Sequence, residues 1–139
     1  MKITDDQTDS QSLADFGSLA AQLLCSGEFH ALAQQFGYAL AYDRDPASAI
    51  REELSFSLAE IGASSLGQPP TSLPSVSYFK PNDTGLFALI EQLIPTDSSG
   101  HVLLELIVSG RGLINMSRLS RSVPRPNNSF KPTPLRGAA

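Results

Sequence analysis

Acidic and basic side chains concentrate between residues 43 and 53 of this 139-residue sequence. Asp43 and Arg44 precede a predicted helix, and Glu52 and Glu53 lie in its first turns. Carboxylates beside an arginine can perform acid–base chemistry or bind a cation. Acids near a helix N-terminus also have a structural explanation, because the helix dipole favours them there. We favour the structural explanation, and keep Asp43, Arg44, Glu52 and Glu53 as candidate binding residues.

A second polar group lies on a predicted turn and contains Lys80, Asn82, Asp83 and Thr84. Short polar side chains are typical of turns, since they bond to the nearby backbone. Because this turn could also border a pocket, Lys80 and Asp83 are further binding candidates.

Histidine and cysteine are scarce, with only His30, His101 and Cys25 in the whole sequence. A zinc or iron site usually needs several ligands at short spacing, and no such cluster occurs. Cys25 ends a predicted helix, where the dipole disfavours a thiolate. Structural roles are favoured for all three, with a Cys25–His30 pair as the weaker alternative. We expect no metal ion, no cofactor and no catalytic residue, and a single cysteine excludes an internal disulfide.

Known catalytic motifs are missing as well. The sequence contains no phosphate-binding glycine loop, no nucleophile elbow, no HExxH and no Walker motif. We therefore lean towards a protein that is not an enzyme.

The charge is divided unevenly along the chain. Residues 1–110 contain all 14 acidic residues and four of the ten basic ones, and residues 111–139 contain six basic residues and no acid. Such a division indicates two parts with different origins or different roles. The polar, acidic start lacks a secretory signal, and no apolar run reaches the roughly 20 residues of a membrane span, so we expect a cytoplasmic protein.

Three helices are predicted in the first half. Apolar residues recur at helical spacing over residues 12–25, with Ser10 or Ser12 as the cap, and a second short helix runs from about Glu28 to Gly37. The third has the clearest signal, since Asp45 can cap it and Pro46 suits its first position. Between the second and third helices, residues 38–42 fit a short strand or an extended connection.

The second half predicts strands. A first strand is predicted to start at residues 76–79. The alternating apolar residues of 101–109 predict another strand. Residues 86–94 match either a strand or a helix. We prefer the strand, because residues 95–100 form a natural hairpin link, and residues 113–116 would make a further arm. On these strands Glu91 and Glu105 are expected at outward positions.

Together these elements predict one α+β domain, in which three N-terminal helices pack on a small antiparallel meander of three or four strands. We expect residues 1–9 to be disordered, residues 10–120 to form the domain, and residues 121–139 to be a flexible, basic, proline-rich tail.

Residues 127–139 read NNSFKPTPLRGAA. This stretch resembles the peptide produced when a reading frame runs into the recombination site of an integron gene cassette, which is an imperfect inverted repeat. The resemblance implies a bacterial protein carried on a mobile genetic element and says nothing about the domain. The basic residues then reflect GC-rich recombination DNA; the weaker alternative is that they contact nucleic acid phosphates.

For function, we expect a small acidic binding protein, of an immunity-like, antitoxin-like or regulatory kind. It would bind a basic protein partner or form a homodimer through an exposed sheet edge. We expect no membrane association, and nucleic acid is disfavoured by the acidic domain. The alternative is a small enzyme or ligand-binding domain that uses the carboxylates of the Asp43–Glu53 region.

Overall fold

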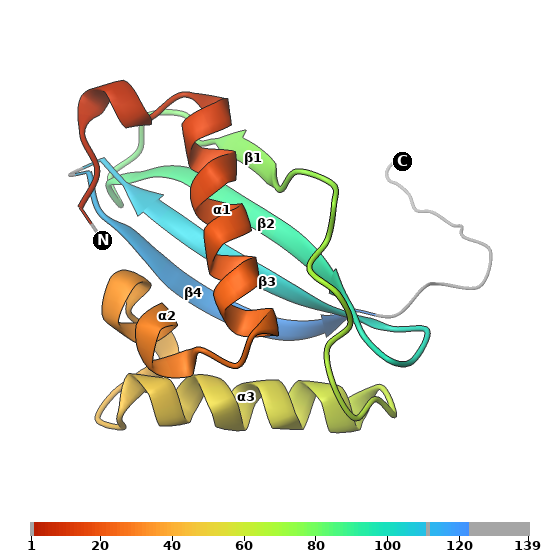
Figure 1. The fold of residues 1–139 in the computed structure, drawn as a ribbon. Helices are drawn as coiled ribbons and strands as arrows, with labels where there is room; N and C mark the ends of the chain where they lie inside the picture. Colours follow the sequence, from red (N-terminus) through yellow and green to blue (C-terminus); the bar gives the residue numbers. More distant parts are fainter. Residues whose placement is uncertain (1, 111, 123–139) are drawn as a thin grey trace, which may run out of the picture.

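The computed structural model describes residues 2–110 and 112–122. Three helices precede a four-stranded sheet in which each strand pairs antiparallel with the next, in the order β1-β2-β3-β4 (Figure 1). This confirms the predicted α+β fold with N-terminal helices and a β-meander. The elements are η1 (Asp5–Gln7), α1 (Ser10–Cys25), α2 (Phe29–Phe36), η2 (Ala39–Ala41), α3 (Pro46–Glu60), β1 (Ser75–Tyr78), β2 (Leu86–Pro95), β3 (His101–Ser109) and β4 (Ile114–Ser122).

The starts of α1 and α3 are fixed by aspartate caps. The Ser48 backbone N–H donates to Asp45 Oδ2 at 3.0 Å, and Pro46 occupies the first turn of α3, as the sequence predicts. In α1 the cap is Asp9 rather than a serine, since the Ser12 backbone N–H donates to Asp9 Oδ2 at 3.1 Å. The helix therefore begins two residues earlier than the apolar periodicity indicates.

The prediction for residues 38–42 is corrected. This segment forms the short 3-10 helix η2, and its only strand-like contact among the described residues is a single bridge between Tyr38 and Met116. The Tyr38 side chain is buried, with 7% of its surface exposed. Because that side chain anchors the chain beside β4, the backbone turns there and does not continue as a strand.

Residues 2–9 begin with contacts to the last part of the described sheet. The Ile3 backbone N–H donates to the Gly112 carbonyl at 2.7 Å, and Lys2 forms a bridge with Leu113. The Ile3 side chain joins the hydrophobic core. Since these partners lie near the other end of the described chain, the local composition gives no sign of them.

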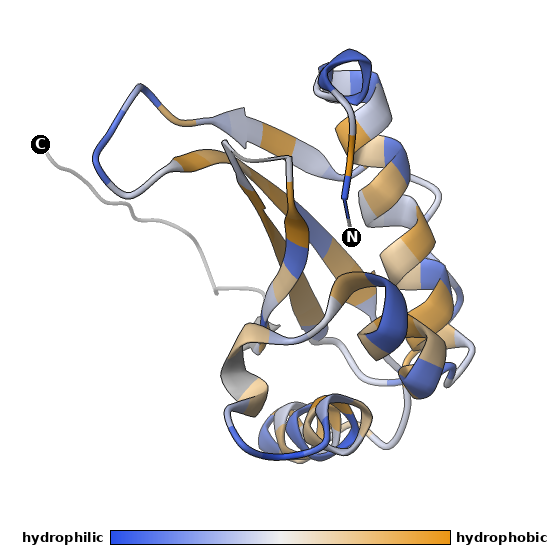
Figure 2. Cartoon of the chain, turned by 90° about the vertical axis from the view of Figure 1, so that its left-hand side faces the viewer, coloured by the Kyte–Doolittle hydropathy of each residue, from blue (hydrophilic) through white to orange (hydrophobic). Residues whose placement is uncertain are grey.

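The core lies between the helices and one face of the sheet. Residues 86–94 form a strand, as preferred, and the alternating side chains of β2 and β3 divide between two faces. Helices α1 and α2 cover one face, α3 lies along the β4 side, and no described segment covers the opposite face (Figures 1 and 2). The apolar sheet residues of the core are at most 4% exposed and comprise Ala88, Ile90, Ile94, Val102, Leu104, Leu106, Val108, Ile114, Met116 and Leu119.

The last strand of the sheet, β4, is also the last described element of the chain. Strand β4 starts at Ile114 and ends at Ser122, so it is longer than the arm expected over residues 113–116. An irregularity between Glu105 and Leu106 places one extra residue in β4. The remainder of the predicted tail, residues 123–139, lies outside the described residues. Within the described part, no helix is long and apolar enough to cross a membrane.

Candidate functional site

The sheet face that the helices leave open has a regular pattern of apolar and acidic side chains. Across β2 and β3, Leu89 pairs with Ile107, Glu91 with Glu105, and Leu93 with Leu103. These residues alternate with buried core residues, so they project from the opposite side of the sheet. We call these six residues the outer face. Its two carboxylates stand between two apolar pairs.

A polar row crosses the sheet at the position of these carboxylates. Ser75 of β1 pairs with Glu91, and Arg118 of β4 pairs with Glu105. Two like charges directly opposite each other on neighbouring strands are destabilising. Partial burial raises the pKa of Glu105 and so does the nearby Glu91 charge, while Arg118 acts in the opposite direction. The outer face therefore holds negative charge in surroundings that solvate it poorly.

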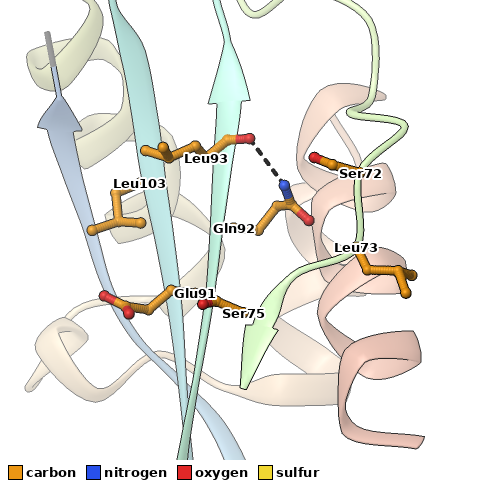
Figure 3. Close-up of a pocket in the computed structure, with 7 residues that line it drawn as sticks. All are labelled: Ser72, Leu73, Ser75, Glu91, Gln92, Leu93 and Leu103. Atoms are coloured by element: carbon orange, nitrogen blue, oxygen red, sulfur yellow. Dashed lines mark hydrogen bonds between the residues drawn. The ribbon is translucent and has the colours of Figure 1, made fainter. Parts of the chain in front are cut away.

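A pocket of about 400 Å³ lies at one end of the outer face (Figure 3). Leu93 and Leu103 belong to both the pocket and the outer face, and Leu73 and Leu93 are 62% and 48% exposed. Seven residues line it: Ser72, Leu73, Ser75, Glu91, Gln92, Leu93 and Leu103.

The pocket exists because β1 stops short of the full length of β2. Strand β1 begins at Ser75, whose partner is Glu91, and Pro74 just before it has no N–H to continue the ladder. The carbonyl of Leu93 points away from β3, and the Gln92 side-chain Nε2 donates to it at 3.0 Å (Figure 3). A gap lined by leucines with a carboxylate at its rim can accept an apolar side chain that has a cation beside it.

The candidates of the Asp43–Glu53 region do not gather at this face. Asp43, Arg44 and Glu52 are exposed, and Arg44 Nη1 forms a surface ion pair with Glu52 Oε1 at 2.9 Å. Exposed ion pairs of this kind contribute about 0–1 kcal/mol. The exposure of Asp43 and Glu52 weighs against a shared catalytic pocket.

Glu53 differs from the other three candidates because it is half-buried. It lines a hollow of about 370 Å³ between α3 and β4, together with Phe56, Glu60 and Arg118. Phe56 is 61% exposed there. Below this region the Tyr38 hydroxyl is buried, and burial together with the Glu53 charge raises its pKa to about 12. The Tyr38 side chain is therefore neutral, and its position beside β4 is structural.

Lys80 and Asp83 lie on the exposed connection between β1 and β2. Asn82 holds this turn, since its Nδ2 donates to the Lys80 carbonyl at 2.7 Å and its Oδ1 accepts from the Thr84 N–H at 3.0 Å. Asp83 lines a separate hollow with Ser109 and other residues. The structural interpretation of this turn is thus the simpler one.

Cys25 and His30 belong to helices α1 and α2, whereas His101 lies on the same side of β3 as Leu103 and lines a neighbouring hollow with Leu93 and Pro95. Burial raises the pKa of the Cys25 thiol, so the reactive thiolate is disfavoured. Among residues 2–110 and 112–122, no three His, Cys, Asp or Glu side chains come together in a way that could hold a metal ion.

Sequence reasoning placed Glu91 and Glu105 on outward positions, and the register agrees. It did not single out Leu93, Leu103 and Leu73 as a surface. A signal was present, because an antiparallel sheet with one face in water usually alternates apolar and polar residues. Strands β2 and β3 instead carry apolar residues on both faces.

Comparison with protein-family models, curated proteins and solved structures found no match for this chain.

Proposed function

We propose that this protein is a non-enzymatic interaction protein that binds a basic, apolar-flanked segment of a protein partner on its outer face. The observation that supports this proposal most directly is the Glu91–Glu105 pair between the Leu89–Ile107 and Leu93–Leu103 pairs. A lysine or arginine of a partner would relieve the repulsion between the two carboxylates. Apolar side chains beside that cation would cover the leucines.

The charge of the chain fits this kind of partner. Residues 1–110 contain 14 acidic and four basic residues, so the domain attracts basic proteins and repels nucleic acid. Electrostatic complementarity of this kind speeds association and selects against acidic partners.

The shape of the surface favours a peptide segment over a small molecule. The pocket lies at one end of the outer face, and two of the leucines that line it, Leu73 and Leu93, are substantially exposed. Leucines in that position suit one anchoring side chain of a longer segment, while the carboxylates fix its register.

The proposal can be tested with short synthetic peptides that carry one Lys or Arg between two Leu residues. In NMR titrations we expect the amide signals of β2 and β3 outer-face residues to shift, and matched peptides with Glu in place of the cation to give no shift. Glu91→Gln with Glu105→Gln should weaken binding at least about tenfold, roughly 1.4 kcal/mol. Glu52→Gln with Glu53→Gln removes the same charge on α3 and serves as the control. Equal loss in both double variants would show a general charge effect and exclude a specific face.

We further propose that the protein is cytoplasmic and is encoded on a mobile gene cassette. The support is the resemblance of residues 127–139 to a translated recombination site, and this segment lies outside the described residues. The coding DNA provides the test: the codons of residues 131–139 should form an imperfect inverted repeat, and their failure to do so would remove the proposal.

A further inference from the structure

The chain leaves the sheet beside the pocket. Ser122, the last residue of β4, pairs with His101, and Ser120 pairs with Leu103, which lines the pocket. Ser122 therefore lies about two residues along the strands from the leucine pair at the end of the outer face, one strand across from Leu103 and two strands across from Leu93.

The sequence after β4 contains basic residues next to apolar residues, which is the kind of segment that the proposed function assigns to this face. Residues 123–139 contain Arg125, Lys131 and Arg136 and no acid. Their only large apolar side chains are Phe130 and Leu135, and each is followed directly by a basic residue. In such a pair, the apolar side chain matches the leucine-lined pocket and the cation matches the Glu91 carboxylate.

We propose that residues 123–139 bind the outer face of their own chain, with Phe130 in the pocket and Lys131 beside Glu91. This inference rests on the proposed function, since it names an intramolecular occupant that a partner must displace. The segment then acts as a built-in competitor at the binding surface.

The distances allow this arrangement. Two residues along a strand and two strand spacings across correspond to about 7 Å and about 10 Å, so the pocket lies roughly 12 Å from the end of β4. The eight residues from Ser122 to Phe130 span up to about 26 Å when extended. The connection therefore reaches the pocket with slack, and its proline residues do not need to pair with the sheet.

A segment of the same chain is favoured over a second copy. A connection of about eight residues gives an effective concentration on the order of millimolar, far above the concentration of another molecule in dilute solution. Two outer faces packed together would also place four carboxylates of Glu91 and Glu105 side by side, which is unfavourable.

The test uses a nitroxide on the full-length chain. In the variant Cys25→Ser/Thr133→Cys, the only thiol lies between Lys131 and Leu135 and can be spin-labelled. We expect strong paramagnetic broadening of the amides of Glu91, Leu93 and Leu103, weak broadening on α3, and no change on dilution. Broadening that is absent from the outer face, or that disappears on dilution, would overturn the intramolecular arrangement.

Charge exchange then tests the contact itself. Lys131→Glu should abolish most of the broadening at the outer face, and Glu91→Lys added to Lys131→Glu should restore it. Arg125→Glu makes the same charge change in the same segment and leaves Phe130-Lys131 intact, so it should keep the broadening. Equal loss in the Lys131 and Arg125 variants, or no restoration in the exchanged pair, would overturn the proposal.

The same variants separate this inference from the proposed function. If the segment occupies the face nine-tenths of the time, Phe130→Ser/Lys131→Glu should bind the Leu-Lys-Leu peptides about tenfold more tightly than the unmodified chain. Equal affinity would overturn the competitor role and leave the proposed binding function standing. Absence of peptide binding in the variant would count against the proposed function. The spin-label experiment tests the intramolecular contact independently of peptide binding.

Discussion

Glu91 and Glu105 stand directly opposite each other on β2 and β3, on the face of the sheet that no described element covers. On the other face of the same strands, Ile90 pairs with Leu106, and both are 1% exposed. One sheet thus combines a well-packed apolar face with a face whose centre holds two facing carboxylates, of which Glu105 also has Arg118 of β4 beside it. This organisation suits a surface that folds without a partner and is stabilised further when a cation binds between the carboxylates. The free energy that the carboxylates cost the free protein can be measured.

We predict that Glu105→Gln stabilises the protein at neutral pH. The pKa of Glu105 is raised from its usual 4.5, first by partial burial, so near and above this value the folded state binds more protons than the unfolded state. Stability therefore falls as the pH rises through the interval between 4.5 and the folded-state pKa, and the loss is complete above it. The variant should show a higher free energy of unfolding near pH 7 and a flatter pH profile, by urea denaturation.

Glu91→Gln is the matched control, because it removes the neighbouring charge and keeps the Glu105 carboxylate. It should lower the pKa of Glu105, read from its side-chain carboxyl NMR signal. A loss of stability in Glu105→Gln near pH 7 would mean that the attraction of Arg118 outweighs the burial, contrary to the prediction.

Leu103 and Leu104 are neighbours in sequence and lie on opposite faces of β3. Leu104 is 1% exposed in the core, and Leu103 lines the open pocket. We expect Leu104→Ala to cost about 2–5 kcal/mol of unfolding free energy, as typical for a core leucine. Leu103→Ala should cost less than half of that and should weaken peptide binding instead. Similar losses of stability in both variants would show that Leu103 contributes to the packing of the core as much as Leu104 does.

The contrast between these two leucines shows which parts of the fold the sequence predicts. Alternation identifies β3 and the preference for a strand in β2, and Asp45-Pro46 identifies the start of α3, because those signals depend only on neighbouring residues. The contact of Ile3 with Gly112 and the bridge of Tyr38 with Met116 join residues that are distant in sequence. Local reasoning therefore misses both.

The sequence did not predict the pocket on the outer face, because its residues are also distant from one another in sequence. Charged residues of the Asp43–Glu53 region draw attention because they cluster in sequence, yet Asp43 and Glu52 are exposed. Leu73, Leu93 and Leu103 come from three separate segments, and their common pocket depends on where β1 ends. That depends in turn on Pro74, whose effect on pairing is clear only once β1 and β2 are known to be neighbours.

Gly17 of α1 is required by the close approach of this helix to the sheet. A methyl group at this position would lie 2.7 Å from Ile90 Cγ2 and 2.8 Å from Pro74 Cγ. Alanine is the better helix former by about 0.5–1 kcal/mol. We nevertheless expect Gly17→Ala to destabilise the protein by about 1–3 kcal/mol, because overpacking pushes α1 away from β2.

Ser18→Ala on the same helix is the control and should be close to neutral, since Ser18 is only half-buried and lies beside the contact. Urea denaturation of both variants gives the comparison. A stabilised Gly17→Ala variant would show that α1 can shift outward at little cost.

Gly112 attaches the first residues of the chain to the sheet. Its φ of +76° is a backbone conformation that favours glycine, and a methyl group there would lie 2.8 Å from the Ile3 carbonyl oxygen. We expect Gly112→Ala to break the hydrogen bond from the Ile3 N–H and to release residues 2–8, with faster amide hydrogen exchange there.

Gly85→Ala is the control, because its φ is also positive, +72°, but nothing lies within 4 Å of the added methyl group. Strain alone should destabilise both variants, whereas release of the N-terminal residues should appear only in Gly112→Ala; protection of the Ile3 amide that survives in this variant would contradict the assigned role of Gly112.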